Sequence, residues 1–256
     1  MSTRDDLLKP VVAGQARILT IDIERLPGLA PVWDQKTRYI PASQWVRYPR
    51  MVCFAAEWYG ATTPLFHASW HKTDMVKAAW DLYDRADVVV TFNGVRFDNT
   101  HLRTEWLLAG LPPPSPWKDV DLFQVAARTF GFDSKSLAHL CERLDLPGKT
   151  GHYDSKVAEA AAAGDKTAQT ELRSYNLGDI AANWAVYDRL RPWIHNHPHI
   201  NVTDKPTCNK CGSTDLNRIG DYRAIVLDYA AYRCADCGGL IRAGHTRRAA
   251  TTRGIR

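Results

Sequence analysis

The sequence predicts an α/β protein with a mixed sheet flanked by helices, followed by a small cysteine-rich module. Short apolar strands come first, and strands then alternate with helical patterns, an order typical of a mixed α/β sheet. Four of the six cysteines stand as two Cys-x-x-Cys pairs near the C-terminus. A chain of 256 residues is long enough for one sizeable domain and one small module.

The first part of the chain predicts strands. Residues 17–23 (RILTIDI) alternate in polarity and are rich in β-branched side chains. Four prolines between residues 26 and 50 exclude a regular helix there. Residues 51–59 and 64–70 predict two more strands, joined as a hairpin by a turn at residues 60–63.

One more strand and several helices follow. Thr73 is the expected N-cap of a helix that runs to Arg85. The apolar run at residues 87–92 predicts a buried strand. Further helices are expected at residues 98–109, 119–129, 136–144 and 171–190, and Pro192 ends the last of them.

The chain divides into two parts that differ in net charge. A polar linker at residues 195–204 predicts a boundary between a domain at residues 1–198 and a module at residues 205–256. That module contains ten Lys and Arg against four Asp, or +6, whereas the rest of the chain holds 23 basic and 24 acidic residues, or −1. A basic module on a neutral body favours a polyanionic partner, and a solubilising tail is the alternative. If the four cysteines bind Zn²⁺ as thiolates, the metal unit adds a net charge of about −2, which leaves the module mildly basic.

Two acids lie close together on the first expected strand. Asp22 and Glu24 are separated by one residue, so their side chains share one face of the strand. Neighbouring carboxylates repel each other and lose solvation when buried, and a divalent cation removes that cost. Taken alone, such a pair is more typical of a strand end whose acids face solvent.

Two further sites carry acids. Asp98 follows the buried strand and its turn and stands at the start of a helix, where it could equally be only an N-cap. Tyr175 and Asp179 are four residues apart on the last long helix and share one face, a pair that many helices contain.

Together, these sites match the motifs of a known family. ILTIDIE, FNGVRFD and YNLGD resemble, in order, the three motifs of the DEDD 3′–5′ exonucleases of the ribonuclease H-like superfamily. The N-x-x-x-F-D form resembles the proofreading domain of B-family DNA polymerases. Residues 17–198 resemble stand-alone phage and bacterial exonucleases related to that domain, and the resemblance continues into the C-terminal module. The DEDDh branch has His five residues before the last acid, but position 174 is Ser, so Tyr175 indicates the DEDDy branch.

The resemblance implies a ribonuclease H-like fold and a two-metal-ion 3′–5′ exonuclease acting on DNA in phage or bacterial replication or repair. It implies that Asp22, Glu24 and Asp179 hold the Mg²⁺ or Mn²⁺ that activates the attacking water. Asp22 would also bridge to a second ion, with Asp98 in its shell. Oxygen-only ligands suit these hard cations.

The resemblance also implies roles beyond the acids. Tyr175 would orient the attacking water, because a phenol with a pKa of about 10 is a poor general base. Asn93 and Phe97 would contact the substrate, although Phe97 equally suits core packing. Two alternatives stay open: an exoribonuclease acting on short RNA, and a non-catalytic nucleic-acid-binding adaptor. Intact acids at all four positions speak against the adaptor.

The cysteines predict a second metal site. Each Cys-x-x-Cys pair is followed by a glycine, Gly212 or Gly238, which suits the left-handed position after a tight turn. Four soft ligands in two pairs favour tetrahedral Zn²⁺, and an expected strand at residues 223–233 completes the pattern of a zinc ribbon. Disulfides or a rubredoxin-type iron site are the alternatives. Cys53 and Cys141 are expected to be reduced core residues. The expected zinc ligands are Cys208, Cys211, Cys234 and Cys237.

Location and partners follow from the same features. No apolar segment is long enough to span a bilayer, and residues 1–10 lack the apolar stretch of a signal peptide. We therefore expect a cytoplasmic protein without membrane partners, in the host cytoplasm if it is phage-encoded. Expected partners are nucleic acid, with DNA favoured, and a separate polymerase. The ribbon is expected to bind DNA or a partner, or to be a structural cap.

Overall fold

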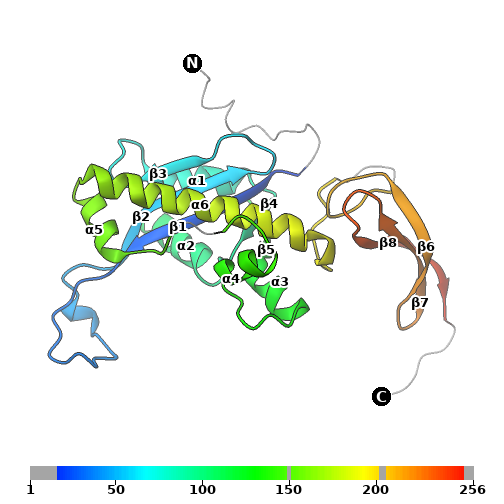
Figure 1. Ribbon diagram of the computed structural model, residues 1–256, viewed down its shortest axis with the longest axis horizontal. Helices are drawn as coiled ribbons and strands as arrows, with labels where there is room; N and C mark the ends of the chain where they lie inside the picture. Colours follow the sequence, from blue (N-terminus) through cyan, green and yellow to red (C-terminus); the bar gives the residue numbers. More distant parts are fainter. Residues whose placement is uncertain (1–15, 149–150, 202–205, 251–256) are drawn as a thin grey trace.

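The computed structural model describes residues 16–148, 151–201 and 206–250. Its main body is built on a five-stranded sheet with the order β3-β2-β1-β4-β5 (Figure 1). β2 pairs antiparallel with β1 and β3, whereas β4 pairs parallel with β1 and β5. The predicted mixed sheet is therefore confirmed. The strands are β1 Ile18–Leu26, β2 Arg50–Trp58, β3 Leu65–Ala68, β4 Val88–Thr91 and β5 Lys118–Asp121.

Helices cover both faces of this sheet. α1 and α2 pack on one face, and the long helix α6 runs across the other over β1 and β2 (Figure 1). α3, α4 and α5 pack against α6 on its side of the sheet. Of the described helices, none is both long and apolar enough to cross a bilayer. The helices are α1 Met75–Arg85, α2 Asp98–Leu108, α3 Leu122–Thr129, α4 Leu137–Arg143, α5 Ser155–Ala162 and α6 Lys166–Leu190.

Alternation along β1 decides which side chains meet which helices. Ile21 and Ile23 are buried in the apolar cluster formed with α1 and α2. Ile18 is buried instead in the cluster formed with α3, α4 and α6. Because successive side chains of a strand point to opposite faces, the even-numbered Asp22 and Glu24 share the α6 face. The central strand thus carries its acids beneath the longest helix.

Three expected elements differ from the structure. Residues 119–121, expected as the start of a helix, belong to strand β5, and the helix begins at Leu122. Parallel pairing with buried β4 stabilises this short polar strand, and local propensity does not contain that information. The side chain of Asp74, and not that of Thr73, caps α1. α6 begins at Lys166 and not at residue 171.

Residues 27–49, which we call the arm, project from the main body beyond the end of β1 (Figure 1). As expected, the arm contains no regular helix, only a short 3-10 turn, η2 (Ala42–Gln44). Its stem is closed by an isolated antiparallel bridge between Leu29 and Arg47. Gly28 is required there, because a Cβ at this position would lie 2.2 Å from the ring of Trp45.

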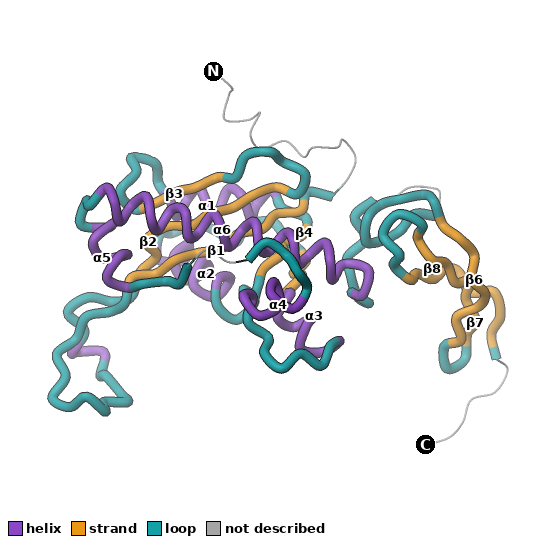
Figure 2. The backbone as a smooth tube through the Cα atoms, in the orientation of Figure 1, coloured by secondary structure: helices purple, strands orange, loops and turns teal. Residues whose placement is uncertain are grey.

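A second sheet follows the main body. After α6 and the short helix η3 (Arg191–Trp193), three antiparallel strands pair in the order β6-β7-β8 (Figure 2). They are β6 Leu216–Arg223, β7 Leu227–Cys234 and β8 Leu240–Ala249. Only the central strand was expected, at residues 223–233, because the two outer strands are rich in polar and charged side chains. The structure begins this strand at Leu227, since Arg223 ends β6 and residues 224–226 form the turn between the two strands. The four clustered cysteines lie in the turn before β6 and in the turn that follows β7, of which Cys234 is the last residue.

Candidate functional site

Three carboxylates meet between β1 and α6. One oxygen from each of Asp22, Glu24 and Asp179 lies within 4.8 Å of the other two. Glu24 is 9% exposed and Asp179 is 3% exposed, so their charges are largely removed from water. Without a cation this arrangement is costly, because like charges repel and desolvation disfavours the ionised form. Three hard oxygen ligands at this spacing fit a divalent ion such as Mg²⁺ or Mn²⁺.

Asn176 positions the Asp22 carboxylate. This residue is fully buried on α6, and its Nδ2 donates to Asp22 Oδ2 at 2.7 Å and to the Asp22 carbonyl at 3.1 Å. Asn176 and Asp179 are three residues apart and share a helix face, so α6 brings both to β1 together. Asn176 is not among the expected site residues. The sequence feature that points to Asn176 is an amide side chain directly after Tyr175, on the same helix face as the expected metal ligand Asp179.

Asp98 approaches β1 from the start of α2. Its Oδ1 accepts a hydrogen bond at 3.0 Å from the backbone N–H of Ile23, the residue between the two acids of the strand. β4 pairs with β1 only at residues 18–20, which leaves this amide accessible beyond the end of β4. The N-cap position of α2 belongs to Phe97, so the simpler interpretation of Asp98 as a helix cap is wrong.

The environment of Asp98 favours its neutral form in the absence of metal. Asp98 is 4% exposed, and burial raises its pKa to about 7. The negative charge of Asp121 adds to the rise in pKa, whereas the hydrogen bond from the Ile23 amide opposes it. Among the described residues, Asp98 lies outside the group of three carboxylates within 4.8 Å.

The turn between β4 and α2 is held by Asp121. Asp121 Oδ1 accepts from the amide of Asn93 at 3.0 Å, and Oδ2 accepts from the amide of Val95 at 3.4 Å. Asn93 has a φ of 64°, which Asn tolerates better than most residues, and a Cβ on Gly94 would lie 2.4 Å from Thr91 Cβ. Asp121 is not among the expected residues, because this stretch was expected to be helical.

Phe97 is exposed at the start of α2. Its side chain is 44% exposed, and its ring meets His101 edge to face with centroids 4.7 Å apart. Core packing, the alternative left open for this residue, is therefore wrong. Asn93 is half-buried in the turn that precedes it.

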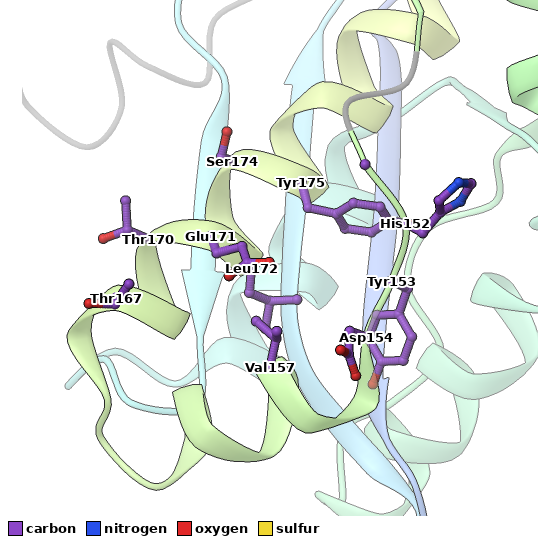
Figure 3. A pocket seen from close by; sticks show the side chains of 11 residues that line it. His152, Tyr153, Asp154, Val157, Thr167, Thr170, Glu171, Leu172, Ser174 and Tyr175 are labelled. Atoms are coloured by element: carbon purple, nitrogen blue, oxygen red, sulfur yellow. The ribbon is translucent and has the colours of Figure 1, made fainter.

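A cavity of about 410 Å³ opens beside Tyr175, between α6 and the segment that leads into α5 (Figure 3). Tyr153 and Tyr175 both line it, with ring centroids 6.5 Å apart. The Tyr153 hydroxyl donates to the carbonyl of Arg25 at 2.6 Å, which ties this segment to the residue after Glu24. Burial raises the pKa of Tyr153 to about 12, and the charge of Glu24 adds to the rise. The cavity volume is within the range of small-ligand pockets.

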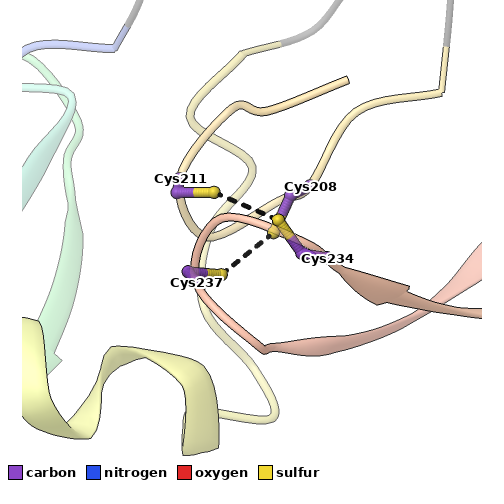
Figure 4. Close-up of side chains that lie close together, drawn as sticks. All are labelled: Cys208, Cys211, Cys234 and Cys237. Carbon is purple, nitrogen blue, oxygen red and sulfur yellow. Dashed lines mark hydrogen bonds between the residues drawn. The ribbon is translucent and has the colours of Figure 1, made fainter. Parts of the chain in front are cut away.

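Four thiols meet at the start of the second sheet (Figure 4). Cys208 Sγ lies 3.7 Å from Cys237 Sγ, and Cys211 Sγ lies 3.6 Å from Cys234 Sγ. A disulfide would need about 2 Å, whereas a tetrahedron with metal–sulfur bonds of about 2.3 Å has edges of about 3.8 Å. The thiols therefore fit a tetrahedral metal ion. The glycine after each Cys-x-x-Cys pair has the expected positive φ. The two cysteines outside this cluster, Cys53 and Cys141, are buried free thiols, as expected.

Lys210 connects this cluster to the main body. It lies within the first Cys-x-x-Cys pair and is 3% exposed. Its Nζ donates to the carbonyl of Pro192 in η3 at 2.6 Å and to the carbonyl of Leu240 at 3.3 Å. A buried ammonium needs compensation, which these carbonyls and the neighbouring thiolates can provide. Lys210 is not among the expected site residues, and its signal in the sequence is a lysine between two paired cysteines.

The fold of this chain is similar to part of a solved structure. The chain is similar to the family B DNA polymerase from the hyperthermophilic archaeon Pyrobaculum calidifontis, with a TM-score of 0.53 and 17% sequence identity. The likeness covers 70% of this chain and 25% of the polymerase, so the chain matches about a quarter of that protein's length. A search of curated proteins finds no match.

The family comparison extends over more than half of the chain. Residues 56–191 match a model of the RNase H superfamily (RNase_H_2). The matched range contains Asp98, Tyr175 and Asp179 and begins after the acids of β1. Together with the mixed sheet, this match supports a nuclease. The chain belongs to the RNase H superfamily.

Proposed function

We propose that the protein is a two-metal-ion 3′–5′ exonuclease of the DEDDy type that hydrolyses DNA single strands or 3′ ends. The observation that carries the proposal is the approach of Asp22, Glu24 and Asp179 to within 4.8 Å, on a central strand and a helix of an RNase H superfamily fold. The DNA preference is supported by the fold shared with a DNA polymerase. An exoribonuclease on short RNA is the second candidate, because the carboxylates do not distinguish the two sugars.

The carboxylates would hold the ions. Asp22, Glu24 and Asp179 would hold one Mg²⁺ or Mn²⁺, and Asp22 with Asp98 would hold a second. Bound ions of this kind supply an activated water and neutralise the charge on the leaving oxygen. Asp98 would ionise when it binds a cation, because the positive charge offsets the burial that favours its neutral form.

The other residues would position the reactants. Asn176 keeps the Asp22 carboxylate directed at the cluster through its 2.7 Å hydrogen bond. Tyr175, at the edge of the cavity, would orient the attacking water through its hydroxyl. Phe97 offers an exposed ring on which a base can stack, and Asn93 lies in the turn beside it.

The second sheet would form a zinc ribbon. Cys208, Cys211, Cys234 and Cys237 would bind one structural Zn²⁺, as their sulfur spacing supports. We assign residues 1–198 to the nuclease domain and residues 205–256 to the ribbon with its basic tail, although residues 1–15, 149–150, 205 and 251–256 lie outside the described part. The ribbon would bind DNA or a separate polymerase in phage or bacterial replication or repair, in the cytoplasm.

Strand-degradation assays test this function. DNA and RNA single strands, labelled at either end, are incubated with the protein and Mg²⁺ or Mn²⁺. We expect a descending ladder from 5′-labelled DNA and early release of a mononucleotide from 3′-labelled DNA. Equal or faster cleavage of RNA would favour the exoribonuclease. Absence of cleavage with either ion would leave only the non-catalytic nucleic-acid adaptor.

A further inference from the structure

We propose that the arm, residues 27–49, is a platform that binds the single-stranded part of the nucleic-acid substrate on the 5′ side of the bond to be cleaved. This inference rests on the proposed nuclease function, since it identifies where the strand leads away from the carboxylates. The arm begins three residues after Glu24, a distance on the order of 10 Å along a β-strand.

The side chains of the arm match the chemistry of a single strand. The arm contains four aromatic residues and three basic residues against one acid. Trp33 is 96% exposed, Tyr39 77% and Tyr48 60%, which is unusual for large apolar rings. Single-strand sites combine stacking rings with positive charge, because every base has a π-face and every linkage has a phosphate. The basic residues are Lys36, Arg38 and Arg47.

The arm is continuous with the expected substrate contacts. Arg25 Nη1 lies 3.1 Å from His101 Nε2, and Arg25 Nη2 donates to the carbonyl of Pro49 at 3.1 Å. His101 in turn meets the exposed ring of Phe97 edge to face. A line of cationic and aromatic side chains therefore runs from Phe97 at the turn before Asp98 to the stem of the arm.

The stem of the arm is anchored on the main body. Arg47 forms an ion pair with Glu159 of α5, and its guanidinium also donates to the carbonyl of Pro27. Trp45 stacks with Tyr48 at 5.8 Å and covers Gly28. An anchored stem reduces the entropy lost when a strand binds, which favours the use of exposed rings as fixed stacking surfaces. With Arg47 paired to Glu159, the remaining charges of the arm are Lys36 and Arg38 against Asp34. This net positive charge favours a polyanionic strand over a neutral or basic partner.

The experiment compares a long and a short substrate. The long substrate is a 5′-labelled strand of about 20 nucleotides, longer than the ~4–16 nucleotides that single-strand sites cover. The short substrate is thymidine 5′-(4-nitrophenyl phosphate), which is too small to reach the arm from the carboxylates. The test variant is Trp33→Ala with Tyr39→Ala, and Trp33→Phe with Tyr39→Phe is the stacking-competent rescue. Leu107→Ala with Leu108→Ala, which truncates exposed apolar residues at the other end of α2, is the matched control.

We expect the test variant to raise KM for the long strand about tenfold and to leave hydrolysis of the short ester unchanged. The rescue and control variants should retain the wild-type KM. Lys36→Gln with Arg38→Gln should make the negative slope of log K for strand binding against log salt shallower by about 1.4, if two phosphate contacts are lost.

The outcomes separate the arm from the nuclease function. An unchanged KM for the long strand with intact ester hydrolysis would overturn the arm proposal and leave the nuclease standing. Equal losses on both substrates would also overturn it, because they indicate damage at the carboxylates. If the wild type cleaves neither substrate, the nuclease proposal fails, and fluorescence anisotropy of the labelled strand then decides the arm. Wild-type affinity in the arm variants would mean that the arm has another partner, such as a protein.

Discussion

The carboxylate cluster and the thiol cluster gather their ligands in opposite ways. Asp22 and Asp179 come from the central strand and the longest helix, which are embedded in three apolar clusters. The thiols come from two turns within residues 208–237, and in the described part of the ribbon the only buried apolar side chains are Cys208 and Cys234 themselves. The apolar core therefore holds the carboxylates in place, whereas a metal ion held by the four thiols would stabilise the second sheet directly, because this sheet has almost no apolar core of its own.

The largest expected effect separates catalysis from folding at the carboxylate cluster. Asp179→Asn removes one ligand charge with little change in volume, so hydrolysis should fall by about 10³-fold or more, because metal ions contribute several kcal/mol to such reactions. The thermal midpoint of the main body should not fall. Glu142→Gln, which likewise exchanges a carboxylate for an amide at an exposed residue of α4, is the control and should keep full activity. Full activity of Asp179→Asn would exclude this residue as a ligand.

The second prediction addresses the thiol cluster. A zinc-selective chelator should unfold the ribbon and leave the main body folded, because binding of structural Zn²⁺ contributes about 10 kcal/mol or more to such small modules. Limited proteolysis should then cleave within residues 206–250 and spare residues 16–198, and added Zn²⁺ should restore resistance. Removing Mg²⁺ alone should not expose the ribbon. A ribbon that stays resistant after the metal is removed would show that its strands are stable without it.

The third prediction concerns positioning within the carboxylate cluster. Asn176→Ala removes the amide that holds Asp22, and loss of such outer partners typically weakens metal affinity or activity about 10–100-fold. The effect should be seen as a higher Mg²⁺ concentration for half-maximal activity. Asn183→Ala is a matched control, since Asn183 is also buried on α6 but bonds the Thr20 hydroxyl at 3.5 Å. Equal shifts in both variants would assign Asn176 a packing role only.

The smallest expected effect is a pH dependence of stability. The pKa of Asp98 is raised by burial to about 7, above the value of about 3.9 in an unfolded chain. The stabilisation of the folded, neutral form is therefore present at low pH and is lost as the pH rises from about 4 through about 7. The thermal midpoint of the wild type minus that of Asp98→Asn, both without Mg²⁺, should decrease between about pH 5 and about pH 8. All other titrating groups are common to both proteins, so they cancel in this comparison. A difference in thermal midpoint that does not change with pH would therefore contradict the raised pKa of Asp98.

Local patterns in the sequence were sufficient for much of the site. The spacing of Asp22 and Glu24 placed both on one strand face, because side chains alternate along a strand whatever packs against it. The spacing of Tyr175 and Asp179 likewise placed both side chains on one face of a helix. The paired cysteines were recognisable because their geometry is formed within a single turn and needs no distant partner.

Tertiary packing decided the remainder. Asn176 and Asp121 each act through a hydrogen bond to a residue on a distant element, and no local periodicity contains such a contact. Strand β5 exists because a buried neighbour supplies its backbone hydrogen bonds. The exposure of Phe97 likewise depends on how α2 lies on the sheet. Propensity and spacing are properties of a few consecutive residues, whereas burial and hydrogen-bond partners arise only when the sheet and its helices pack together.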